Sequence, residues 1–271
     1  MKENIDIRQP IVEGLFYPSD QALLDLKIES LLDKNSADIK ESCKTIIVPH
    51  GGWDYTGDYI ARGFNSLKKE NISRVIIISN VHREFSDNIY IPQARYFQIL
   101  DNKIKLDLDS ISKIEKLGKK VLKTNVPHME EHGIECILPF VYYQYPQAKI
   151  VPILLGKTIV SLVRNLSNIL LEIADENSII IISSNFSGYE KEEFSKVIGE
   201  QGVSLVIEGK MGELIELTRT NKLKTCGAGA IASILLYGRY SRIKVFKQGL
   251  TEQTPLSGGK ATYYGTLGFL E

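Results

Sequence analysis

The sequence predicts an α/β protein, with a single three-layer α/β/α sandwich around a mostly parallel sheet that is mixed at its edge. Two observations predict this fold. Short runs rich in Ile and Val recur along the chain, and amphipathic segments of helical length lie between them. Nearly continuous apolar runs are typical of parallel strands covered on both faces, and alternation of such strands with helices is typical of a layered α/β fold.

The elements follow in chain order. Helix 19–34 carries Leu and Ile on one stripe, and Asp20 suits the positive N-terminal end of its dipole. No linker or repeat divides the chain, so residues 1–271 are expected to form one domain. The strands are expected at 45–48, 74–79, 149–154 and 178–183, with tail strands, one of them antiparallel, at 244–248 and 262–270. The helices are expected at 19–34, 58–69, 110–123, 132–143, 160–175, 190–208 and 227–237.

Composition excludes several functions. The 271 residues hold 33 Lys and Arg against 33 Asp and Glu, so the formal charge is zero. A nucleic-acid or anionic-membrane binder gathers excess cations on one face, so neither partner is expected. The longest apolar run, around 179–182, is far shorter than the ~20 residues of a membrane helix. Three scattered cysteines and an N-terminus without an apolar signal core predict a cytoplasmic protein, whose neutral surface permits a homodimer.

Two of the four histidines follow expected strands. His50 comes after strand 45–48, and His82 comes after strand 74–79. Ligands of open α/β sheets bind beyond the carboxyl ends of the strands, so both imidazoles would point into one crevice if these strands were neighbours. A lone loop histidine is most often a hydrogen-bonded structural residue. A converging pair, by contrast, is half of a metal site.

Cys226 begins a helix of small residues, in the segment Thr225-Cys226-Gly227-Ala228. The free backbone N–H groups and the dipole at a helix N-terminus stabilise a thiolate. A buried structural cysteine is the plain alternative. Together with His50 and His82, this thiolate would complete a three-ligand metal site.

The segment 128–135 allows three interpretations. His128, Glu131 and His132 match the H-x-x-E-H pattern of inverted zinc peptidases, in which both histidines hold zinc and the glutamate is the general base. Pro127 and Gly133 weaken the helix that this pattern needs. The segment could also be a plain acidic helix N-terminus. We favour the third interpretation, in which Glu131, His132 and Glu135 line the crevice around the metal ligands.

Taken together, these motifs resemble the Memo family over nearly the whole chain. Residues 8–18 are similar to the family's opening R-x-P-x-x-A-G-x-F-Y-P, and residues 48–57 are similar to its P-H-A-G-Y-x-Y-S-G. Further matches, in order and at suitable spacing, are His82, residues 131–140, residues 149–153, Thr225-Cys226-Gly227 and residues 263–265.

The resemblance implies a fold related to the class III extradiol dioxygenases, which hold non-haem iron with two histidines and a carboxylate. In Memo-like proteins a cysteine takes the place of the carboxylate, and iron or copper is attributed to the site. Carried onto this chain, the ligands are His50, His82 and Cys226. Bacterial and archaeal members commonly accompany an AMMECR1-like protein and a radical-SAM protein, so the resemblance also implies association with these partners.

The chain departs from the family in one segment. The family pattern S-[SA]-D-x-S-H-Y corresponds here to residues 183–189, where Asn185 replaces the acid and Gly188 replaces the histidine. That histidine matches the general base of the dioxygenases, and loss of an acid or base typically costs ~10²–10⁴ in rate. Ring opening by the dioxygenase route is therefore not expected here, and His132 is the remaining histidine that could act in its place.

Three functional hypotheses follow. The first is a metal-dependent redox or oxygen-handling enzyme acting on a small molecule. In it, His132 is the acid or base, oriented by Glu131 or Glu135, and Tyr55, Asn185 and Tyr189 line the substrate side. The second is a binding module whose crevice receives a small molecule or peptide without chemistry. The third uses Cys226 as a nucleophile and His132 as its base, as in amide-cleaving enzymes.

Overall fold

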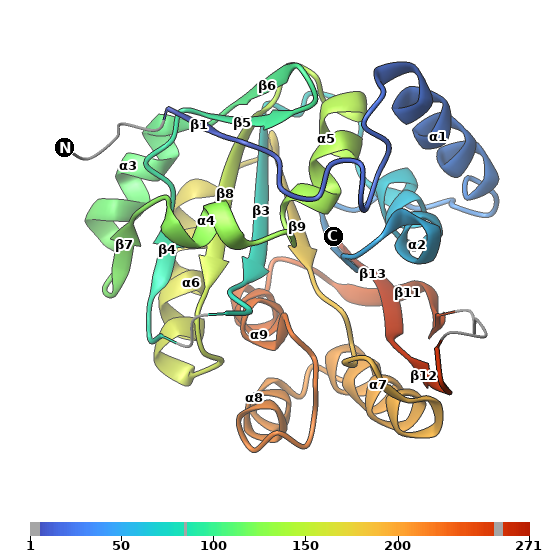
Figure 1. The fold of residues 1–271 in the computed structure, drawn as a ribbon. Coiled ribbons are helices and arrows are strands. Elements are labelled where there is room, and N and C mark those ends of the chain that lie inside the picture. Colours follow the sequence, from blue (N-terminus) through green and yellow to red (C-terminus); the bar gives the residue numbers. More distant parts are fainter. Residues whose placement is uncertain (1–5, 84–85, 252–256) are drawn as a thin grey trace.

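An eight-stranded sheet forms the centre of the computed structural model, which describes residues 6–83, 86–251 and 257–271 (Figure 1). The four inner strands β2, β9, β3 and β8 run parallel. Antiparallel pairing appears toward the edges, between β11 and β13, β13 and β2, and β4 and β8. In sheet order the strands are β11 (Arg242–Leu250), β13 (Tyr263–Leu270), β2 (Thr45–Val48), β9 (Ser178–Ser183), β3 (Arg74–Asn80), β8 (Lys149–Leu155), β4 (Ile89–Ile91) and β7 (Val121–Lys123).

The inner strands are apolar because helices cover both of their faces. Ile46, Ile77 and Ile181 are each 0% exposed, as continuous burial of a parallel sheet requires. The predicted runs 45–48 and 178–183 are confirmed to the residue, and the other two runs extend by one residue each. The antiparallel tail strands are also confirmed, so the predicted mostly parallel sheet with mixed edges is correct.

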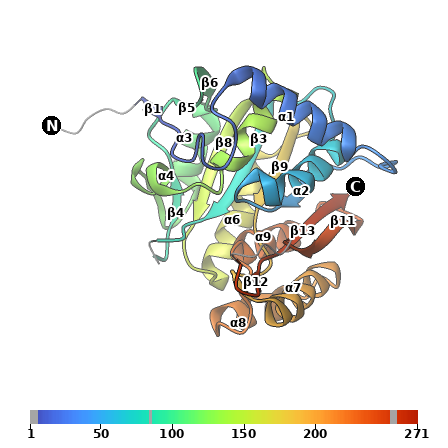
Figure 2. The same ribbon diagram turned by 45° about the vertical axis from the view of Figure 1, so that its right-hand side comes forward.

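Helices form the two outer layers. The connection from β2 to β3 and the connection from β8 to β9 run in opposite directions across the sheet. Since such crossovers are right-handed, α2 and α6 lie on opposite faces (Figure 2). Helix α1 packs on α2, and α9 packs on α6 and β3. The helices are α1 (Gln21–Lys34), α2 (Trp53–Ser66), α3 (Leu108–Leu117), α4 (Val126–Glu130), α5 (Leu138–Gln144), α6 (Val160–Ile173), α7 (Glu192–Ile207), α8 (Met211–Arg219) and α9 (Ala228–Tyr237).

Three predicted helices are wrong in part. The helix expected at 58–69 begins earlier, at Trp53, and ends at Ser66. The segment 110–123 stops being helical at Leu117, and the residues after Gly118 form the edge strand β7. The segment 132–143 begins as irregular backbone and becomes helical only in a single 3₁₀ turn (Glu135–Ile137) that leads into α5. The last difference matters for function because the irregular part passes beside the carboxyl ends of the inner strands.

Several elements were not anticipated from the sequence. They include β4, β7, α4, α8 and two small sheets, because short segments with mixed polarity carry a weak periodic signal. The first small sheet joins β1 (Ile7–Arg8), β5 (Tyr96–Ile99) and β6 (Asn102–Lys105), and the second joins β10 (Glu190–Lys191) and β12 (Lys260–Ala261).

One large hydrophobic cluster extends from the N-terminal helices to the last strand. Within the described ranges, every helix is too short or too polar to reach across a bilayer.

Candidate metal centre

Three loops bring His50, His82 and Cys226 together at the carboxyl edge of the sheet. His50 lies two residues beyond β2, His82 lies two residues beyond β3, and Cys226 lies just before α9. The condition that β2 and β3 be neighbours is not met, because β9 lies between them. The imidazoles nevertheless converge above the end of β9, and their ring centroids are 5.1 Å apart.

The three side chains present one ligand atom each within 4.8 Å of the others. In the part of the chain that the structure describes, this is the one such group of three or more His, Cys, Asp or Glu residues. The Sγ of Cys226 lies 3.7 Å from Nε2 of His50. Bonds of about 2.1 Å to nitrogen and 2.3 Å to sulfur at a tetrahedral angle would place these atoms roughly 3.6 Å apart. The donor set and its spacing therefore fit a transition metal.

Ser183 fixes the tautomer of His50. The Ser183 hydroxyl donates to the backbone oxygen of Gly133 at 2.6 Å, so it can only accept from Nδ1 of His50 at 2.8 Å. Nδ1 of His50 therefore carries the proton, and Nε2 presents its lone pair toward Cys226. His50 is 4% exposed, which holds the ring in this orientation.

Glu131 performs the same task for His82. Its Oε2 accepts from Nδ1 of His82 at 2.7 Å, and its Oε1 accepts from the His82 backbone N–H at 2.8 Å. The lone pair of Nε2 is left for a metal, as in the carboxylate–histidine–metal arrangement common in metalloproteins. Glu131 is 3% exposed and the His82 side chain is 32% exposed, so the contact is shielded from water on the side of the carboxylate.

The charges around Cys226 favour its thiolate. Burial by itself would raise the pKa of this thiol, but His50 and His82 hold it well below its usual value. Burial likewise opposes protonation of His82, yet Cys226 and Glu131 raise the pKa of His82 to about 10. The backbone N–H of Asn185 donates to Sγ at 3.1 Å and adds to the stabilisation. Without a metal, the site is thus a thiolate beside an imidazolium.

Asn185 holds the backbone of His50. Its Oδ1 accepts from the His50 N–H and its Nδ2 donates to the His50 carbonyl oxygen, both at 3.1 Å. Both ends of the amide are therefore engaged with the same residue. The expectation that Asn185 lines the substrate side stays a prediction.

His132 forms the third imidazole of the site. Its ring centroid lies 5.4 Å from that of His50 and 5.5 Å from that of His82. Burial, followed by the charges of His50 and His82, lowers the pKa of His132 to about 4. At neutral pH this ring is therefore uncharged.

Glu135 anchors the N-terminal segment. It forms a buried ion pair with Arg8, accepts backbone N–H groups from Ile11 and Val12 at 2.9 Å, and accepts the Tyr17 hydroxyl at 3.1 Å. Arg8 in turn donates to the backbone oxygen of Glu131 at 2.9 Å, so it supports the loop that carries Glu131.

These contacts correct two expectations. We expected Glu131 or Glu135 to orient His132. Glu131 instead orients His82, and Glu135 instead binds Arg8. Glu135, 1% exposed and surrounded by these partners, is also not a wall of the crevice. Ser183 and Arg8 were not predicted as site residues, although Ser183 lies at the carboxyl end of a predicted strand, and this position is a usable signal.

The zinc-peptidase interpretation is wrong. His128 is 2% exposed and packs edge-on against Phe97 at 5.8 Å, and neither of its ring nitrogens has a hydrogen-bond partner. Helix α4 ends at Glu130, so Glu131 and His132 do not continue its face. The hydrolase hypothesis named His132 as the base for Cys226. The imidazole nitrogen 3.7 Å from Sγ of Cys226 belongs to His50, so His50 would be the base in that hypothesis.

Tyr55 and Tyr189 line an outer cavity of about 240 Å³. They are 48% and 56% exposed, and the Tyr189 hydroxyl donates to the backbone oxygen of Ser257 at 3.1 Å. Tyr264 shares this cavity and borders Gly51, whose φ of +139° favours glycine next to His50. Tyr264 was not singled out from the sequence.

The chain is similar to a family of known proteins. A family model described as "Memo-like protein" matches residues 8–253. A MEMO1 family protein of Thermoplasma volcanium is 27% identical over 243 residues, covering 88% of each chain. Another, from Nitrosopumilus maritimus, is 23% identical over 237 residues and covers 85% of this chain and 86% of its own.

Among solved structures, an uncharacterized protein of Escherichia coli K12 superposes with a TM-score of 0.51. It covers 82% of this chain and 98% of its own length at 10% identity. At this identity the likeness extends to the fold alone.

Proposed function

This chain belongs to the Memo-like protein family, and on that premise we propose that His50, His82 and Cys226 hold a redox-active metal ion that handles oxygen or a small-molecule substrate. One observation carries the proposal: Nδ1 of each imidazole is committed to a buried partner, so Nε2 is the nitrogen that each ring offers beside the same thiolate, to a metal that displaces the His82 proton. A histidine with a purely structural role has no need of this arrangement.

Iron or copper is the proposed metal. Imidazole suits both ions, and a soft thiolate favours copper, zinc and iron over the hard cations. Three protein ligands leave coordination positions for an exogenous group, and a bound ion would supply Lewis acidity and electron transfer there. The protein's own part is to fix the two imidazoles, stabilise the thiolate and exclude bulk water from one side.

His132 is the proposed acid–base group. Its imidazole is neutral at physiological pH and lies beside both ligand rings. Because its pKa is low, it would accept a proton only when the negative charge of a bound substrate raises that pKa. Tyr55 and Tyr189, on the outer cavity, would contact a substrate that enters from that side.

The test is anaerobic reconstitution with Fe(II) or Cu(I), followed by measurement of metal content. We expect about one ion in the wild type and strong loss in His50→Ala and Cys226→Ser, because a site with three protein ligands cannot spare one. His128→Leu is the matched control, since it removes a histidine outside the site. Equal metal content in all four proteins would overturn the proposal. A zinc titration in parallel establishes whether the site prefers a redox-inert ion.

A binding module without chemistry is the second candidate. The Asn185 amide favours this candidate, because it is hydrogen-bonded to the His50 backbone and cannot act as an acid or base. Gly188 also favours it, because glycine has no side chain. Oxygen consumption or substrate turnover by the reconstituted protein would exclude it. Metal binding without either would favour it.

A further inference from the structure

A cavity of about 510 Å³ opens beside the metal ligands, and His82 and Cys226 form part of its wall. The rest of its wall comes from the end of β3, the loop between β8 and α6, the end of α8 and the loop before α9. This volume is typical of a site for a small organic molecule. The proposed metal function assigns no role to this cavity.

The wall of this cavity is cationic. Lys157, Arg219 and Lys224 contribute to it, and no Asp or Glu of the described chain does. Lys157 and Arg219 have acidic partners outside the wall, at 3.3 Å and 2.9 Å. The Nζ of Lys224, in contrast, donates to the neutral amide oxygen of Asn221 at 2.6 Å. The cavity thus retains positive charge for a ligand.

Two residues of the wall also have buried polar atoms without partners. Oδ1 of Asn80 and Oγ1 of Thr218 have no hydrogen bond, although Nδ2 of Asn80 donates to the Gly156 carbonyl oxygen at 3.2 Å. Native proteins rarely leave such atoms unsatisfied, because burying a polar group without a partner is costly. Both atoms lie just beneath the surface of the wall, so a ligand with a hydroxyl or amide group would satisfy them once the Asn80 or Thr218 side chain turns toward the cavity.

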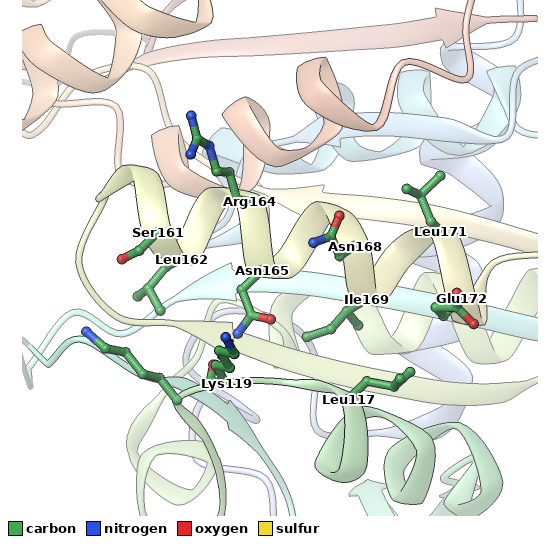
Figure 3. Close-up of a pocket in the computed structure, with 11 residues that line it drawn as sticks. Leu117, Lys119, Ser161, Leu162, Arg164, Asn165, Asn168, Ile169, Leu171 and Glu172 are labelled. Carbon is green, nitrogen blue, oxygen red and sulfur yellow. Dashed lines mark hydrogen bonds between the residues drawn. The ribbon is translucent and has the colours of Figure 1, made fainter.

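The cavity drawn in Figure 3 can be compared with the cavity beside Cys226. It has a similar volume, about 540 Å³, lies between α6 and the segment after α3, and contains Lys119, Lys120 and Arg164. Its wall also contains Glu172, however, and includes neither a metal ligand nor any of the unpaired polar atoms found in the described residues. Surface cations alone therefore do not distinguish the cavity beside Cys226.

We propose that the cavity beside His82 and Cys226 binds a small organic anion, a carboxylate or a phosphate, that also carries a hydroxyl or amide group. Lys224, with Lys157 and Arg219, takes the anionic end, and Asn80 and Thr218 take the polar group. The opposite end of the ligand reaches the metal ligands. This last statement rests on the proposed metal function, whereas anion binding does not.

The experiment measures anion binding by calorimetry at low ionic strength, where electrostatic contacts are least screened. The probes are malonate and inorganic phosphate, and malonamide is the neutral isostere of malonate. We expect one malonate or phosphate per chain and no comparable binding of malonamide. Lys224→Met should weaken binding at least fivefold, and Thr218→Val should weaken malonate binding by a smaller factor. The stronger of the two anions identifies the chemical class.

Lys119→Met is the matched control from the cavity of Figure 3 and should leave the affinity within twofold. Comparable weakening in Lys119→Met and Lys224→Met, or equal binding of malonamide and malonate, would overturn the proposal. Metal content is measured on the same proteins. Anion binding with no metal uptake would overturn the metal function alone, and metal uptake with no anion binding would overturn this inference alone.

Discussion

Glu131 contacts His82 through both of its carboxylate oxygens, one at the ring Nδ1 and one at the backbone N–H. The two residues are far apart in the sequence, yet this partly buried pair sets the tautomer of one candidate metal ligand. A second candidate ligand, His50, obtains the same result from a neutral hydroxyl, Ser183. The site therefore combines a charged and an uncharged support for its two imidazoles.

Glu131→Gln is expected to weaken metal binding by 10–100-fold, because an amide nitrogen facing Nδ1 of His82 moves the ring proton to Nε2. A competition titration with a chelator measures the affinity. Glu130→Gln, a change at the exposed neighbouring residue, is the control and should leave the affinity unchanged. Unaltered affinity in Glu131→Gln would show that this contact does not set the tautomer.

Gly133→Ala is expected to reduce both stability and metal affinity. A Cβ there would lie 2.3 Å from the Ser79 hydroxyl oxygen and 3.4 Å from Nδ1 of His50. Overpacking of this kind costs about 1–3 kcal/mol, and relief of the clash would displace His50. Urea unfolding and metal titration measure the two effects. Gly212→Ala in α8, where a Cβ meets nothing within 4 Å, should instead be neutral or stabilising.

His128 should make the protein sensitive to mild acid. Burial, reinforced by the charge of Arg8, lowers the pKa of His128 to about 3 in the folded state, whereas an unfolded histidine titrates near 6.5. Between these values the unfolded chain binds the extra proton, so stability falls by about 1.4 kcal/mol for each pH unit below 6.5.

His128→Leu removes this contribution and also the two unpaired ring nitrogens. Urea unfolding at pH 7 and pH 5 should show a loss in the wild type that exceeds the loss in the variant by about 2 kcal/mol. The wild type and the variant have the same carboxylates, so the contribution of these groups to the pH dependence of stability cancels when the two proteins are compared. The same pH dependence in both would mean that His128 is protonated in the folded protein.

In the native metal-free protein, iodoacetamide should label Cys226 alone. Burial raises the pKa of Cys43 to about 11 and that of Cys136 to about 12, whereas His50 and His82 keep Cys226 as a thiolate despite its burial. At neutral pH the labelling rate should exceed that of a free thiol, because more of Cys226 is present as the thiolate. Mass spectrometry counts the labels. Metal loading should block the reaction, and failure of iron, copper and zinc to do so would count against a ligand role for Cys226.

Much of the sheet was predictable because the inner strands are continuous apolar runs, and the bounds of β2 and β9 match the prediction. The positions of His50, His82 and Cys226 at the ends of elements were predictable for the same reason. The strand order was not, because the insertion of β9 between β2 and β3 depends on crossover connections that leave no local pattern.

The roles of the surrounding residues were also hidden. Gly133 packs against Ser79 and has no side chain, and its close contact overrides the helical periodicity of 132–143. Glu131 and Glu135 look alike in the sequence, but their different partners lie 49 and 127 residues away. Such pairings come from tertiary packing and cannot be inferred from spacing.

Asn185→Asp tests whether the chain has merely lost an acid. The family resemblance suggests that this change, made together with Gly188→His, would raise metal affinity or oxidase activity. The structure predicts otherwise for the first change. A carboxylate can accept from the His50 N–H but cannot donate to the His50 carbonyl oxygen, which now receives a bond at 3.1 Å.

We therefore expect Asn185→Asp to lose about 1–3 kcal/mol of stability at pH 7, with metal affinity reduced through displacement of His50. Part of the stability should return in acid, where the protonated carboxyl group donates again. Gly188→His alone should fold normally, since a Cβ there meets only Glu190 at 3.7 Å. Asn168→Asp on the exposed face of α6 is the control for the added charge. A rise in metal affinity in Asn185→Asp without loss of stability would mean that the amide replaced a catalytic acid rather than securing the His50 backbone.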